Sequence, residues 1–134
     1  MFWHIIRRMK NMKRVIIYSP DFSLCYSLLA YLQNHYKLVV TTDFELLNSF
    51  SFNSKNDAVF LDHELDSQLI KTCENLKSHY PEMPIFLTYV YTKKASHSED
   101  KIKSYVNEIF YKPFDLNEIS VKLTDILEDS VYTK

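Results

Sequence analysis

Short apolar runs alternate with helical patterns along this chain of 134 residues. The runs are continuous and short, as in strands that are buried on both faces of a sheet, and they lie at residues 14–19, 36–42, 57–62, 84–90 and 109–111. Each run is followed by apolar residues at helical spacing, which lie at 24–32, 46–50, 69–76, 102–106 and 116–127. The fourth helical pattern is the weakest, because only Ile102, Tyr105 and Val106 mark it. The pattern therefore predicts five βα units.

Five alternations with short connections favour an α/β fold, a doubly wound five-stranded parallel sheet with helices on both faces. One domain is predicted over residues 13–134, after an N-terminal extension over 1–12. The extension mixes apolar residues with cations, but its apolar run is far too short to span a membrane. Thr42 and Glu45 have the spacing of a capping box, which predicts the start of the second helix.

Composition narrows the function only a little. The net charge of -1 gives no electrostatic case for nucleic acid or an acidic membrane as partner. The chain has no glycine, which excludes the glycine-rich phosphate loops. Cys25 and Cys73 fall on the apolar faces of predicted helices, so buried thiols in a reducing compartment are expected, and the cytoplasm is the predicted location.

Charged side chains follow the first, third and fifth predicted strands. Asp21, Asp62 and Lys112 stand at or just after the ends of these strands, and Asp115 with Glu118 then predicts a helix start. The carboxyl ends of parallel strands meet at one edge of a sheet, where sites assemble. Two carboxylates and an ammonium at one edge would suit Mg²⁺ and phosphoryl chemistry.

These marks together resemble the receiver domain of two-component response regulators. The resemblance covers about residues 13–128 and rests on the five βα units, on the stretch VFLD at the third strand and on KPF after the fifth, with 50 residues between Asp62 and Lys112. It implies a flavodoxin-like (βα)5 fold and a signalling role rather than an enzyme.

The resemblance also implies a role for each site residue. Asp62 would be the phosphoryl acceptor, and Lys112 would bridge to the new phosphate. Mg²⁺ would be held by Asp21, Asp62 and the backbone carbonyl of Glu64. The switch hydroxyl at the end of the fourth strand would be Thr88, although counting from Pro84 lands on Tyr89 instead.

The chain departs from the family pattern at several of these positions. Pro20 replaces the first member of the acidic pair, and a shifted alignment would leave Ser19 and Pro20 at the pair and remove Asp21 from it. Ile109 stands where the family usually has an aromatic residue, three positions before the lysine. We therefore expect Mg²⁺ binding to be weak or absent. The short connection from Lys112 to Pro113 is predicted to have a cis peptide bond.

Three functions are compatible with these features. The first is a stand-alone receiver-like domain that relays a phosphoryl signal through Asp62, from a histidine kinase or phosphotransfer protein to a protein partner. The second is a pseudo-receiver that binds partners independently of phosphorylation. The third, a small flavodoxin-like enzyme or nucleotide binder, is disfavoured by the lack of glycine. A homodimer is predicted through the face of the fourth helix, fifth strand and fifth helix, where Tyr105, Tyr111 and Phe114 supply aromatic area.

Overall fold

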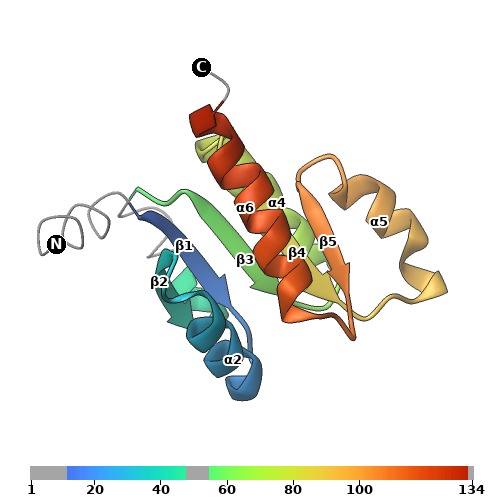
Figure 1. Ribbon diagram of the computed structural model, residues 1–134. Helices are drawn as coiled ribbons and strands as arrows, with labels where there is room; N and C mark the ends of the chain where they lie inside the picture. The colour runs from blue at the N-terminus through green and yellow to red at the C-terminus, as the bar shows by residue number, and fades with distance from the viewer. Residues whose placement is uncertain (1–11, 48–54, 133–134) are drawn as a thin grey trace, which may run out of the picture.

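The computed structural model describes residues 12–47 and 55–132, and within them the chain forms a five-stranded parallel sheet covered by helices (Figure 1). The strands are β1 (Lys13–Tyr18), β2 (Tyr36–Thr41), β3 (Ala58–Asp62), β4 (Ile85–Tyr89) and β5 (Glu108–Tyr111). The helices are α2 (Phe22–Leu32), α4 (Ser67–His79), α5 (Ser96–Ile102) and α6 (Leu116–Tyr132), with a 3-10 turn η1 (Lys93–Ala95) before α5. The predicted extension lies almost entirely outside the described residues.

The strand order is β2-β1-β3-β4-β5, and every neighbouring pair is parallel. This is the flavodoxin-like order, in which the chain reverses direction across the sheet between β1 and β3. The predicted doubly wound fold is therefore confirmed. Because β1 and β3 are adjacent and central, the residues that follow them lie side by side at the carboxyl edge of the sheet.

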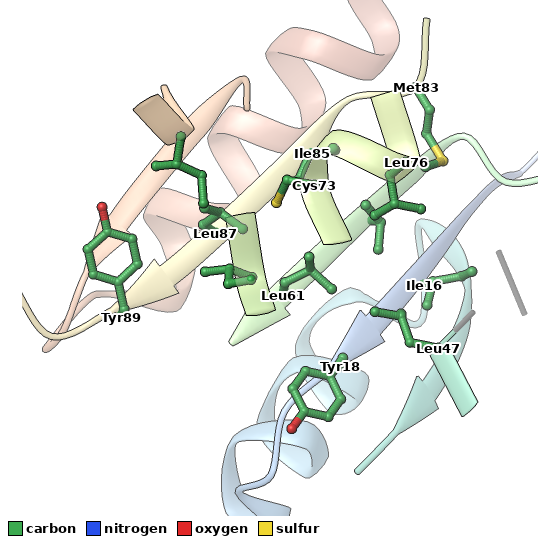
Figure 2. Packing of buried hydrophobic residues seen from close by; sticks show 13 residues of the cluster. Ile16, Tyr18, Leu47, Leu61, Cys73, Leu76, Met83, Ile85, Leu87 and Tyr89 are labelled. Carbon is green, nitrogen blue, oxygen red and sulfur yellow. The ribbon is translucent and has the colours of Figure 1, made fainter. Parts of the chain in front are cut away.

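The sheet separates two apolar cores, as its continuous apolar strands require. One core joins alternate strand residues to α4 and α5 (Figure 2) and includes Ile16, Leu61, Leu69, Cys73, Leu76, Leu87 and Ile102. The other joins the opposite side chains of the strands to α2 and α6 and includes Ile17, Leu28, Leu32, Phe60, Phe86, Ile119 and Leu123. Helices thus cover both faces of the sheet, and both cysteines are buried with free thiols, as predicted.

Helix starts are set by aspartates. Asp66 caps α4 by accepting a hydrogen bond from the Leu69 amide at 2.9 Å, and Asp115 accepts one from Asn117 at the start of α6. The prediction of a Thr42 cap was wrong by one position. Residues 44–47 are helical, and the amide of Glu45 is bonded instead to the carboxylate of Asp43 at 3.0 Å.

The fourth helical pattern was also misplaced. α5 ends at Ile102, and Tyr105 and Val106 lie beyond it, partly buried against the core that α4 and α5 share with the sheet. Their apolar side chains mark a loop that returns to β5 rather than a helix. The peptide bond between Lys112 and Pro113 is cis, as predicted. Among the described helices, none is both long enough and apolar enough to cross a membrane.

Candidate functional site

The carboxylate of Asp62 lies at the carboxyl edge of the sheet, where β3 ends, and is only 4% exposed. Each of its oxygens has a partner within the chain. The ammonium of Lys112 lies 2.6 Å from Oδ1, and the hydroxyl of Ser19 donates a hydrogen bond to Oδ2 at 2.6 Å. Asp62 and Lys112 thus lie together, as predicted. The buried carboxylate has a counter-ion in Lys112 and a hydrogen-bond donor in Ser19, which together offset the cost of burying it.

Ser19 reaches Asp62 because of the strand register. β1 pairs with β3 so that Tyr18 is opposite Leu61. The residues that follow these two, Ser19 and Asp62, therefore lie side by side. The Ser19 side chain is fully buried, and its oxygen also accepts a hydrogen bond from the amide of Asp21 at 3.0 Å. Sequence reasoning considered Ser19 only as an effect of a shifted alignment and missed it as a partner of Asp62. A serine directly after an apolar strand, aligned with the acid after its neighbour, was the available signal.

The carboxylate of Asp21 lies at the start of a helix. Its Oδ1 accepts hydrogen bonds from the amides of Ser23 and Leu24, at 2.9 and 3.4 Å, and so caps the N-terminus of α2. The residue is exposed and is absent from the lining of the pocket at Asp62. Asp21 therefore stabilises the helix start, and the structure shows no contact between its carboxylate and Asp62.

Each predicted Mg²⁺ ligand has a partner within the chain. The carbonyl of Glu64, the third predicted ligand, lies 2.7 Å from Nδ1 of His63. Across the residues for which side chains are described, no group of three histidine, cysteine, aspartate or glutamate side chains is placed to hold a metal ion. Asp62 and Glu64 both line the pocket, and the ammonium of Lys112 neutralises the carboxylate of Asp62, whereas Mg²⁺ is held by several oxygens of net negative charge.

A pocket of about 400 Å³ opens beside Asp62 and Lys112, with Pro20 and Tyr89 in its wall. Thr88 is not in that wall. Its hydroxyl is fully buried and donates to the carbonyl of Phe110 at 2.6 Å. The position that faces the pocket is therefore that of Tyr89, the alternative reached by counting from Pro84.

The hydroxyl of Tyr89 donates to Glu99 of α5 at 2.7 Å. Tyr111 of β5 donates to the other oxygen of Glu99 at 2.8 Å, and Lys103 lies 3.3 Å from it. Burial alone would raise the pKa of Glu99, but the two hydroxyls and the ammonium outweigh burial and lower it. Burial, followed by the bond to Glu99, raises the pKa of Tyr111 to about 12 and raises that of Tyr89 further. This cluster, which sequence reasoning missed, joins β4, β5 and α5.

The three aromatic residues proposed for a partner face divide between surface and core. Tyr111 is 40% exposed at the end of β5. Tyr105 and Phe114 are partly buried and pack against the two cores. Only Tyr111 of the three therefore offers much aromatic surface to a partner.

Comparisons with known proteins add the fold relationship. No family model matches the chain, and no curated protein matches it. Among solved structures, a receiver domain protein described as CheY-like from Methanospirillum hungatei JF-1 matches with a TM-score of 0.78 and 15% identity, covering 92% of this chain and 100% of that one. A two-component response regulator from Clostridium difficile matches with a TM-score of 0.75 and 20% identity, covering 89% and 98%.

A structure described as adenylate cyclase from Rhodopirellula baltica has a TM-score of 0.76 at 13% identity, covering 91% of this chain and 93% of that one. At these identities the likeness establishes the architecture and no particular chemistry. The chain has the fold of response regulator receiver domains.

Proposed function

We propose that this chain is a signalling domain of the two-component type that acts by binding a protein partner, without Mg²⁺-assisted phosphorylation of Asp62 as its switch. The observation that carries the proposal is the pairing of both Asp62 oxygens within the chain, one with Lys112 and one with Ser19. The receiver fold supports the signalling role, and the occupied carboxylate supports the pseudo-receiver form of it.

The physical argument concerns the two requirements of phosphorylation at a carboxylate. The attacking oxygen needs a free lone pair directed at phosphorus, and the metal needs a set of anionic or carbonyl oxygens around it. Ser19 donates to the oxygen that does not contact Lys112, and Asp21 is engaged at the start of α2. Each Asp62 oxygen keeps a second lone pair, but the ion pair and the hydrogen bond make both oxygens weaker nucleophiles. The predicted metal ligand Asp21 is engaged at the helix start, so few oxygens remain to hold the metal.

A second function, phosphorylation of Asp62, is favoured by the pocket beside it. A space of about 400 Å³ is large enough for a phosphoryl group, and Lys112 is one-third exposed at its wall. In this mode an oxygen of Asp62 would bond to phosphorus as the donor's bond to phosphorus breaks. A histidine kinase or phosphotransfer protein would supply the group, and Lys112 would neutralise the added charge.

The proposed partner surface consists of α5, β5 and α6. Tyr111 and Val121 are exposed there, at 40% and 48%, beside a groove that Glu118 and Lys122 also line. An exposed aromatic residue with charges at the rim suits a protein partner whose charges complement these. Homodimerisation through this same face stays a prediction.

A titration of the ¹⁵N-labelled protein with Mg²⁺ tests the proposal. The amides of Asp62 and Lys112 are expected to show no saturable shift in the wild type. Pro20→Asp adds a carboxylate to the pocket wall and is the positive control, in which saturable shifts should appear. Those shifts should be lost when Asp62→Asn is added. Saturable Mg²⁺ shifts in the wild type, removed by Asp62→Asn, would favour the phosphorylated receiver instead.

A further inference from the structure

The outer surface of α2 is apolar although it faces solvent. Phe22 is 78% exposed, Tyr26 is 74% exposed and Leu29 is 38% exposed. All eleven residues of the helix, FSLCYSLLAYL, are uncharged. A helix on the surface of a soluble domain normally carries charged and polar residues on its outer side, and an apolar outer side marks an interaction site.

The same surface has a shape that suits another helix. Residues four apart form a row along a helix, so Phe22, Tyr26 and Ala30 make one row. The neighbouring row begins with Ser23 and Ser27, whose side chains are small. An aromatic ridge therefore lies beside a shallow groove, and two such surfaces can interdigitate with the ridge of each in the groove of the other.

A second copy of this chain is the occupant that the charges favour. A twofold contact places the same patch on both sides, so any charged residue in it would face its own copy or be buried unpaired. α2 has none. The chain's own segment 1–11 is a poorer match, because it carries cations such as Arg7 and Arg8 and α2 offers no acid to pair with them. The groove on β5 and α6 has Glu108, Glu118 and Lys122 in its lining and suits a partner of different chemistry.

We infer that two copies of this chain associate through the outer face of α2, with Phe22, Tyr26 and Leu29 of each copy packed against the serine row of the other. Two exposed aromatic residues and a leucine supply roughly 700 Å² over the two copies, taking about 200 Å² for a whole aromatic side chain. That area is below a standard stable interface of roughly 1,200–2,000 Å². The dimer is therefore weak and concentration-dependent. It does not rest on the function proposed for Asp62.

Sedimentation velocity of the full chain over a range of concentrations tests the dimer. The wild type should pass from monomer to dimer as concentration rises. Tyr26→Lys places a charge in the centre of the contact and should weaken dimerisation about tenfold or more, the effect expected of losing an interface aromatic. Leu46→Lys is the matched control, because Leu46 is 47% exposed on a segment that packs on the opposite face of the sheet from α2, so this change should leave dimerisation unchanged.

Disulfide cross-linking tests the geometry independently. Cys25 and Cys73 are buried and should not form disulfides between copies, so any cross-link comes from the introduced thiol. Ser27→Cys should give a covalent dimer under mild oxidation, and Leu46→Cys should not. A wild type that stays monomeric at every concentration overturns the inference. If removal of residues 1–11 then produced a dimer, that segment would be identified as the one that covers the outer face of α2 in the full chain. A dimer that is broken by Leu46→Lys and not by Tyr26→Lys also overturns the inference.

Discussion

Replacing Glu99 by glutamine should destabilise the domain by about 2 kcal/mol. Glu99 is 6% exposed and accepts hydrogen bonds from the hydroxyls of Tyr89 and Tyr111, at 2.7 and 2.8 Å. A hydrogen bond to a charged group contributes about 1.5–3 kcal/mol, and a neutral one about 0.5–1.5 kcal/mol. The loss is therefore about 1 kcal/mol for each of the two bonds. Lys103 is 55% exposed at its side chain and should add little.

Urea unfolding at neutral pH, followed by far-ultraviolet circular dichroism, measures this difference. The midpoint should fall with the slope unchanged, because the surface exposed on unfolding stays the same. Asp100→Asn is the matched control, since it removes the neighbouring exposed carboxylate of the same helix. The reasoning fails if Glu99→Gln and Asp100→Asn have the same unfolding free energy.

Three further predictions concern the same elements. Folding raises the pKa of Tyr111 from 10.0 to about 12, so the stability that this hydroxyl contributes is complete below pH 10 and is lost as the pH rises towards 12. Between pH 10 and 12 the free energy of unfolding should therefore fall less steeply in Tyr111→Phe than in the wild type. Ser19→Ala removes the donor to Asp62 and should cost about 1–3 kcal/mol in urea unfolding, whereas the exposed Ser78→Ala should cost almost nothing. Asp21→Ala removes the cap of α2 and should cost about 1 kcal/mol by the same measurement; an unchanged midpoint would contradict the capping role.

The architecture could be predicted from the sequence because parallel strands that are buried on both faces consist of continuous apolar residues. Short connections between the elements then allow only a few topologies. The meeting of Asp62 and Lys112 followed from that topology alone. The cap made by Asp21 was not predicted, because a carboxylate after β1 suits a helix cap as well as a metal ion, and the metal role of Asp21 stays a prediction. The Glu99 cluster joins residues on β4, β5 and α5, and no local pattern marks such contacts.

Incubation with acetyl phosphate and Mg²⁺, followed by the mass of the intact protein, tests most directly whether Asp62 is a phosphoryl switch. The paired state of its carboxylate, together with the lack of an acid at position 20 of the pocket wall to help hold Mg²⁺, predicts no adduct in the wild type. Pro20→Asp, which returns an acid to the pocket wall, should acquire a single phosphoryl group that Asp62→Asn removes. A wild-type protein that gains one phosphoryl group, and loses it in Asp62→Asn, would contradict the proposal that this domain signals without phosphorylation.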